Sequence, residues 1–169
     1  MTRSTRSGRL AAITTAALLV PAAAWALGPV GTSGPLADLA PTDPTLDGAT
    51  ARVQVVEIDD GTLVSLKVHG VDRALAGRTL GAHLHVGGCT AGDATGTGAH
   101  YNSSGGAEVS PTTEVWLDFT VTGGGTGHSI AKVPFTVPGG GAGSVVVHAA
   151  PTAPSGAAGA KLACLPVAL

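Results

Sequence analysis

The sequence predicts an all-β protein, an antiparallel sandwich or barrel, and three observations point to this class. Short segments that alternate apolar and polar residues recur along the chain, with glycine-rich turns between them. After residue 26, no stretch shows the 3.6-residue apolar period of an amphipathic helix bounded by capping residues. Aromatic residues make up only 3% of the chain, so the core has to be built from valine, leucine and isoleucine. Regularly spaced strands without helices are typical of sandwiches and barrels.

The first 26 residues have the three zones of a secretory signal peptide. A basic start is followed by an apolar stretch and a small-residue cleavage site: Arg3, Arg6 and Arg9, then residues 10–19, then Ala24-Trp25-Ala26. The alternative is a retained membrane anchor, which needs about twenty unbroken apolar residues, and Pro21 interrupts this run. We therefore expect a secreted protein, in the periplasm or cell-wall space, with no membrane attachment after cleavage.

Residues 27–48 are rich in proline, glycine and alanine and show no period, which predicts a flexible linker and a folded domain over 49–169. Within that domain, residues 51–58 and 62–69 alternate and flank Asp59-Asp60-Gly61, which predicts a hairpin. Further strands are expected at 81–86, 114–121, 129–137, 144–148 and 161–165. This makes about seven strands, and an eighth only if the segment before Ala51 supplies it.

Charge and cysteine content limit the partners and the compartment. Without the three leader arginines, six basic residues face 11 acidic ones, a net charge of about −5 with no basic cluster. This argues against nucleic acid or an anionic membrane as partner. Two cysteines, Cys89 and Cys164, follow the leader, and in an exported protein such a pair most simply forms one disulfide.

The histidines form the pattern that carries chemistry. His83 and His85 are two apart in an expected strand, so their side chains share a face. Such a pair can begin a metal site, because imidazole suits copper, zinc, iron and nickel; the alternative is a pair that only lines a sheet surface. His100 follows a loop of small residues, and His148 ends a run of valines. His69 and His128 are expected on the surface, at a strand end and in a turn.

These landmarks resemble the copper/zinc superoxide dismutase family. Four motifs occur in the family's order over residues 50–169: Gly81-Ala-His-Leu-His85 followed by Cys89, Gly98-Ala-His-Tyr-Asn102, Val145-Val-Val-His148, and Ala158-Gly-Ala-Lys-Leu-Ala-Cys164. The resemblance implies a Greek-key β-barrel of about seven to eight strands that dismutates superoxide to oxygen and hydrogen peroxide. By position, it places the copper ligands on His83, His85, His100 and His148, and the disulfide on Cys89 and Cys164. It also makes a homodimer possible, because members of the family dimerise.

The zinc site of the family has no counterpart in the sequence. The loop of residues 101–113 holds no histidine and no aspartate, whereas a structural zinc needs four N, S or O ligands. The chain is therefore more similar to the copper-only branch, in which carboxylates after the bridging histidine steady its free nitrogen. Glu114 and Asp118 are the candidates, and the alternative is that both are exposed strand residues.

Lys161 stands where the family has an arginine beside the copper. Lysine keeps the positive charge but loses the planar fork of donors, and residues 149–160 carry no charge at all. Together with His100, the expected proton donor, Lys161 is a candidate catalytic residue of a dismutase with reduced activity. The competing interpretations are an exported copper-binding module with little or no turnover, and a structural sandwich with incidental histidines.

Overall fold

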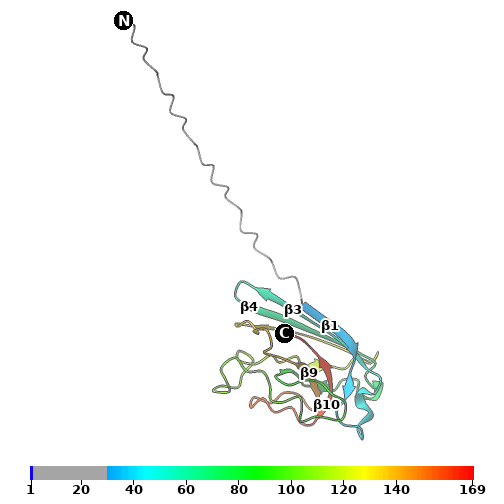
Figure 1. The fold of residues 1–169 in the computed structure, drawn as a ribbon. Helices are drawn as coiled ribbons and strands as arrows, with labels where there is room; N and C mark the ends of the chain where they lie inside the picture. Colours follow the sequence, from blue (N-terminus) through cyan, green and yellow to red (C-terminus); the bar gives the residue numbers. More distant parts are fainter. Residues whose placement is uncertain (2–29) are drawn as a thin grey trace.

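The computed structural model describes Met1 and residues 30–169, which form two four-stranded antiparallel sheets and a short strand pair (Figure 1). In spatial order, the first sheet holds β1 (Val30–Pro35), β3 (Thr50–Ile58), β4 (Gly61–His69) and β8 (Thr126–Val133). The second holds β2 (Ala37–Asp38), β10 (Lys161–Pro166), β9 (Ser144–His148) and β6 (Ala82–His85). The pair is β5 (Thr79–Leu80) with β7 (Phe119–Thr120). The predicted leader, residues 1–26, lies outside the described residues except for Met1.

The predicted all-β antiparallel class is confirmed, but the sheets are not closed into a barrel within residues 30–169. Residues 30–169 form ten strands instead of the predicted seven or eight, and three of these strands are only two residues long. Helical structure in the same range consists of two 3-10 turns, η1 (Pro44–Leu46) and η2 (Arg73–Leu75). No helix in the described part of the chain is long and apolar enough to cross a membrane.

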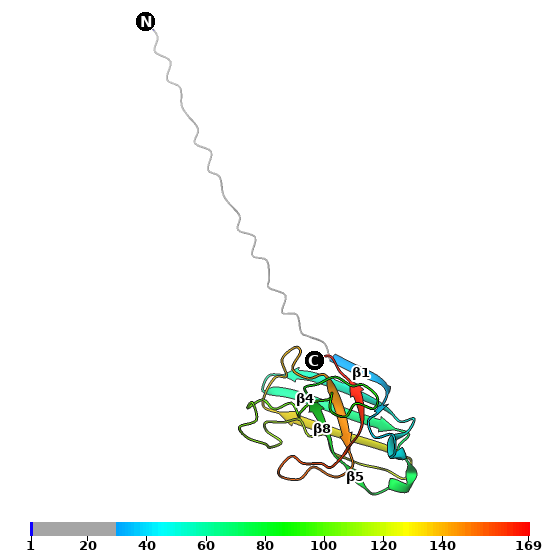
Figure 2. The same cartoon turned by 60° about the horizontal axis from the view of Figure 1, so that its bottom comes forward.

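The two sheets are separate layers of the fold (Figure 2), and the main hydrophobic core is built from side chains of both. Each strand sends alternate side chains inward, as the pleat of a strand requires. The first sheet contributes Val53, Val55, Val64, Leu66 and Val68, and the second contributes Leu84, Val145, Val147, Ala163 and Leu165. The core is aliphatic, as predicted, with Phe119 as its one fully buried aromatic ring among residues 30–169.

Residues 30–38, predicted as part of a linker, instead form β1 and β2. β1 pairs with β3 over six residues, from Val30 opposite Val55 to Pro35 opposite Thr50. Leu36 and Leu46 join the common core. The glycines and prolines of this segment leave no alternation of apolar and polar residues in the sequence. The segment forms a strand because it pairs with β3. The segment before Ala51 thus supplies the additional strand.

The predicted hairpin around Asp59 and Asp60 is confirmed, since Ile58 pairs with Gly61 across this turn. Gly61 has φ +140°, and a Cβ atom there would overlap the carbonyl of Val133 on β8. Only glycine fits a backbone with positive φ this close to a neighbouring strand.

Two predicted strands are displaced or shortened. Of residues 114–121 only Phe119–Thr120 form a strand, β7, although Val115, Leu117 and Val121 remain buried in alternation. β8 begins at Thr126, three residues before its predicted start, and ends before Pro134, which lacks the backbone N–H that pairing needs.

Candidate metal centre

Four histidines from three parts of the fold converge on the outer side of the second sheet. On β6, Ala82 and Leu84 face the core, so His83 and His85 project from the opposite face. His148 ends the neighbouring strand β9, and His100 forms an isolated bridge with His85. One ring nitrogen from each of the four lies within 4.8 Å of the others. Among residues 30–169, this is the one cluster of three or more side chains that could hold a metal ion.

Three of the four rings lie in a buried environment that keeps them uncharged. His83 and His85 are fully buried and His148 is 3% exposed. Burial, followed by the neighbouring imidazoles, lowers the pKa of His83 to about 2. Burial also lowers the pKa of His85 to about 3 and lowers that of His148. Neutral imidazole is the form that binds metals, so these rings are ready to act as ligands near neutral pH.

Hydrogen bonds on the outer nitrogens fix which nitrogen of each ring faces the centre. His85 Nδ1 donates to the carbonyl of Gly98 at 3.0 Å, and His148 Nδ1 donates to the carbonyl of Gly159 at 3.2 Å. A carbonyl can only accept, so the Nε2 atoms of both rings carry free lone pairs. These two Nε2 atoms lie 3.2 Å apart. Two facing lone pairs repel each other, and a cation between them removes the conflict.

His83 presents its other nitrogen to the centre. Its Nε2 lies 2.8 Å from the hydroxyl of Thr152, while its buried Nδ1 has no hydrogen-bond partner among the described residues. Buried polar atoms in native proteins are almost always satisfied, and a metal ion would satisfy this one. The donor set therefore fits a metal that prefers imidazole nitrogen.

Glu114 holds the fourth ring. Its carboxylate, in a residue that is 4% exposed, accepts from His100 Nδ1 at 3.0 Å, so His100 Nε2 is left for the centre. Trp116 Nε1 donates to the same carboxylate at 2.8 Å and Asn102 Nδ2 at 3.2 Å. Three donors thus fix the position of this carboxylate, which in turn orients the ring of His100.

Asp118 supports His83 rather than His100. Its carboxylate accepts both the backbone N–H of Thr152, at 2.7 Å, and the hydroxyl of Thr152. The hydroxyl hydrogen is therefore used on Asp118, and the Thr152 oxygen is free to accept the Nε2–H of His83. Sequence reasoning missed Thr152, because a single threonine in an uncharged loop carries no recognisable signal.

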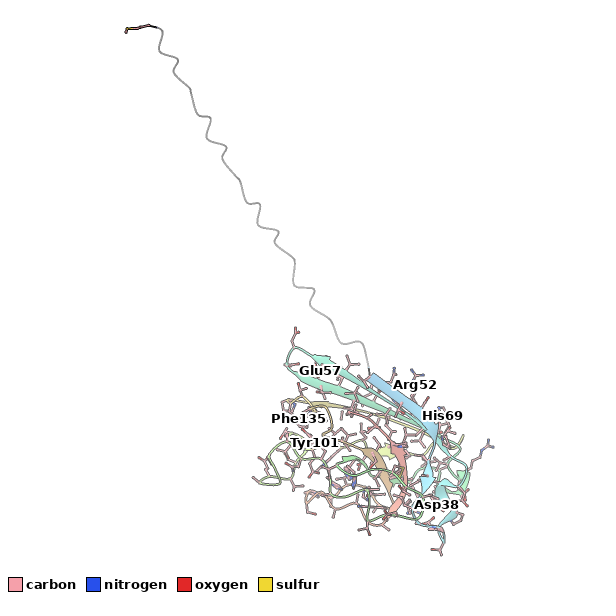
Figure 3. All side chains as sticks on the ribbon, in the orientation of Figure 1. Asp38, Arg52, Glu57, His69, Tyr101 and Phe135 are labelled. Atoms are coloured by element: carbon pink, nitrogen blue, oxygen red, sulfur yellow. A yellow bond between two sulfur atoms is a disulfide. The ribbon has the colours of Figure 1, made fainter. Side chains whose placement is uncertain are left out.

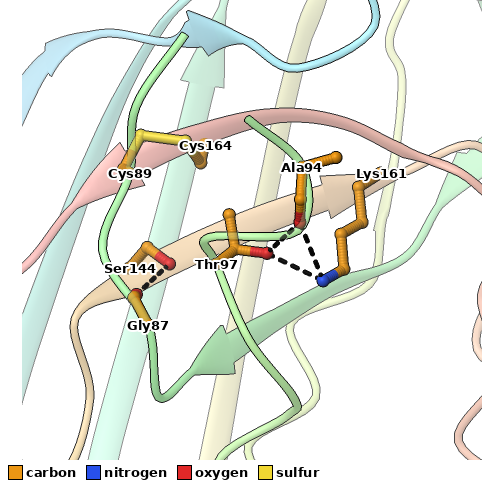
Figure 4. Close-up of a disulfide and its surroundings, with 7 residues drawn as sticks. All are labelled: Gly87, Cys89, Ala94, Thr97, Ser144, Lys161 and Cys164. Atoms are coloured by element: carbon orange, nitrogen blue, oxygen red, sulfur yellow. Dashed lines mark hydrogen bonds between the residues drawn. A yellow bond between two sulfur atoms is a disulfide. The ribbon is translucent and has the colours of Figure 1, made fainter. Parts of the chain in front are cut away.

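The predicted disulfide between Cys89 and Cys164 is present and fastens the loop beside the cluster to β10 (Figure 4). Lys161, also on β10, donates to the Gly98 carbonyl at 2.7 Å, the Thr97 hydroxyl at 2.8 Å and the Ala94 carbonyl at 3.1 Å. All three of its hydrogens can be used in this way, and partial burial lowers its pKa. Lys161 therefore braces the loop whose Gly98 carbonyl also orients His85.

The structure brings the four predicted ligands together, and Glu114 contacts one of them directly. Asp118 and Lys161 contact the cluster only through another group, the Thr152 hydroxyl and the Gly98 carbonyl respectively. His69 and His128 lie apart from them, exposed on the first sheet. The carbonyls of Gly98 and Gly159 could not have been identified from the sequence, because every residue has a carbonyl and only the fold selects these two. The absence of a zinc site remains a prediction.

No protein-family model matches the chain, and no curated protein matches it. Fold and site therefore define a class only: an antiparallel β-sandwich with four histidines arranged to hold a metal ion.

Proposed function

We propose that the protein is an exported, copper-dependent superoxide dismutase that works without zinc. The observation that carries the proposal is the orientation of the four rings: Nδ1 of His83 and Nε2 of His85, His100 and His148 face one point, and each opposite nitrogen is hydrogen-bonded. The sequence order of the landmarks in the superoxide dismutase family supports copper as the metal. The disulfide supports an oxidising compartment. A Greek-key connection of the strands belongs to the same proposal.

Bound copper would supply the one-electron chemistry, oxidising one superoxide to oxygen and reducing a second one. The second superoxide leaves as hydrogen peroxide only after it gains two protons. His100 is suited to relay one of them from water, because its side chain is 20% exposed and its Nε2 could take up a proton while it is not a metal ligand, with Glu114 holding its Nδ1–H. Water supplies the other proton. In this scheme Glu114 keeps His100 in one orientation throughout the cycle.

Lys161 would contribute a positive charge near an anionic substrate. Its three N–H groups donate to the loop of residues 94–98. Lys161 would therefore attract superoxide through its charge and would have no free N–H to donate to it. The uncharged loop of residues 149–160 adds no further attraction. We therefore expect slower turnover than a site with a free guanidinium beside it would give.

The second candidate function is copper holding without turnover. The engaged donors of Lys161 favour it, since they leave no free hydrogen-bond donor for superoxide on that side chain. A holding protein needs the four ligands but needs neither substrate attraction nor a proton donor.

Metal content and superoxide decay, measured on the same sample, test the proposal. The purified protein is reconstituted with copper and zinc and compared with His148→Ala and with His69→Ala, a matched loss of an exposed histidine. We expect one copper, little zinc and superoxide decay in the wild type and in His69→Ala, and loss of both copper and decay in His148→Ala. Copper binding without decay would support the holding protein instead, and absence of copper would contradict both functions.

A further inference from the structure

The outer face of the first sheet carries basic residues aligned across three strands. Arg52 on β3 lies directly opposite Lys67 on β4, and Lys67 lies opposite His128 on β8. All three side chains are exposed, and we name them the cation row after the two charged members, Arg52 and Lys67. Figure 3 labels Arg52 and His69 on this side of the sheet, away from the core.

The cation row has no acidic partner within the described residues. The two ion pairs there are Lys132 with Asp60 and His100 with Glu114, and neither involves the row. Glu57 is the one acidic residue in the four strands of this sheet. It alternates with the core residues Val53 and Val55 and so faces the other way.

This arrangement costs stability unless something outside the protein compensates for it. Like charges directly opposite on neighbouring strands are destabilising. The chain has more acidic than basic residues, so an acidic neighbour for Arg52 or Lys67 would be easy to supply. The unpaired row therefore indicates a surface that meets an external anion.

A groove beside Arg52 gives that anion a place to bind. Its volume is about 240 Å³, and its walls are Gly31, Thr32 and Ser33 of β1 with Arg52 and Gln54 of β3. A Cβ atom at Gly31 would come within 3.1 Å of the Val53 carbonyl and 3.5 Å of Gln54 Cγ, so glycine keeps this part of the groove open. The guanidinium, the amide and the hydroxyl supply donors for an anionic group.

The spacing and the residue composition of this face favour one class of polyanion, a linear glycan. Neighbouring strands are about 4.8 Å apart, so Arg52 and Lys67 start from backbone positions that are separated by a distance similar to the length of one sugar along a linear glycan. Ile130, which is 62% exposed on the same face of β8, offers an apolar surface to a sugar ring. The outward positions of these strands carry no Phe, Tyr or Trp, so the face lacks the stacking platforms of single-stranded nucleic acid sites.

We propose that the outer face of the β1–β3–β4–β8 sheet binds a linear anionic polysaccharide, with one acidic group in the Arg52 groove and the chain continuing over Lys67 and His128. Such contact would hold the protein on an acidic glycan surface, with the metal centre on the other sheet free. The proposal does not depend on copper or on dismutation.

Binding to alginate, a linear polyuronate, tests the proposal. The purified protein is titrated with alginate at low and moderate salt, alongside the Arg52→Gln/Lys67→Gln double variant. Arg73→Gln/Arg78→Gln is the matched control, because it removes the same charge from exposed positions between β4 and β5, outside this sheet. We expect the row variant to bind at least about tenfold more weakly, with a smaller salt dependence, and the control to stay within about twofold of the wild type.

Three results would overturn the proposal. The first is no binding of the wild type to alginate at low salt, and the second is an equal loss in the row variant and the control. The third is tighter binding of the wild type to single-stranded DNA or to anionic phospholipid vesicles than to alginate, which would replace the glycan by another polyanion. Thermal unfolding monitored on each variant verifies that it is folded, and the substituted side chains are all exposed.

Discussion

At the scale of single residues, the orientation of the four histidine rings is set by the groups behind them. Two backbone carbonyls, one hydroxyl and one carboxylate each bind the outer nitrogen of a different ring. A ring held in this way already has the tautomer that presents a lone pair to the centre before an ion binds. Supporting groups of this kind raise metal affinity by lowering the cost of ordering the ligands.

Thr152→Val is predicted to weaken metal binding by about 10- to 100-fold. The valine cannot accept a hydrogen bond, so the buried Nε2–H of His83 loses its partner and the ring is free to turn. Thr152→Ser keeps the hydroxyl and should bind metal as the wild type does. Competition titration against a chromophoric chelator measures both affinities, and equal weakening in the two variants would contradict this role of the hydroxyl.

The metal-free protein is predicted to lose stability as the pH falls below about 6.5. Burial lowers the pKa of His83 to about 2 and that of His85 to about 3, whereas both groups titrate near 6.5 in the unfolded chain. Below that pH the unfolded chain takes up protons that the folded chain cannot, so unfolding becomes more favourable.

Urea unfolding midpoints between pH 7.5 and 5 measure this dependence. The variant His69→Gln should follow the wild type, because His69 is exposed. The variant His83→Gln should lose stability less steeply with falling pH, because one buried titrating group is removed. A wild-type midpoint that stays constant over this range would contradict the argument.

At the scale of elements, an irregularity in β10 aims Lys161 at the loop beside the cluster. Lys161 lies opposite His148, while Ala163 lies opposite Val147, so Leu162 is an extra residue in the ladder. A bulge of this type bends its strand and redirects the side chain next to it. The bulge explains how one strand can place Cys164 in a buried disulfide and Lys161 against residues 94–98.

Gly61→Ala is predicted to destabilise the protein by about 1–3 kcal/mol or more. The positive φ at this position and the nearby carbonyl of Val133 both oppose a side chain. Gly88→Ala is the matched control, since a Cβ there meets nothing within 4 Å and its φ is not positive. Thermal or urea unfolding of the two variants should separate them clearly, and equal stability would show that the hairpin tolerates a side chain.

The elements differ in how far the sequence predicts them. The hairpin of β3 and β4 and the buried strand β9 were predicted nearly to the residue, because alternation, turn residues and a valine run are local signals. β1 was missed, because glycine and proline conceal a strand whose stability comes from pairing with β3. Residues 114–118 alternate like a strand but pair only through isolated bridges, and pairing partners are not encoded locally.

The same distinction holds for the sites. The four ligand histidines were predicted because side-chain identity and order are visible in the sequence. The link from His83 through Thr152 to Asp118 was not predicted, because its two contacts join residues 69 and 34 positions apart through loop geometry. The cation row was not predicted either, since Arg52, Lys67 and His128 form no basic run and only the strand register brings them together.

At the scale of the whole molecule, the disulfide joins stability to the metal centre. It closes a segment of 75 residues between Cys89 and Cys164, a constraint worth up to about 4–5 kcal/mol in the chain-entropy model. The loop that it fastens includes Gly98, whose carbonyl orients His85 and binds Lys161.

The double variant Cys89→Ser/Cys164→Ser is therefore predicted to lose both stability and metal retention. Gly61→Ala provides the comparison, because it lowers stability from the opposite sheet without touching this loop. Mass spectrometry under native conditions reports the fraction of metal retained after dialysis. If the two variants retain the same fraction at equal loss of stability, the disulfide has no separate effect on the centre.

The groups that support the four rings come from three different loops, around Gly98, Glu114 and residues 152–159. An ion at the centre would thus join ligands that three segments hold, and binding to the folded state alone raises stability with ion concentration. A metal-poor environment would leave these loops open to proteases, whereas a metal-rich one would protect them. We therefore expect the lifetime of the protein in the presence of proteases to increase with the concentration of the ion that it binds.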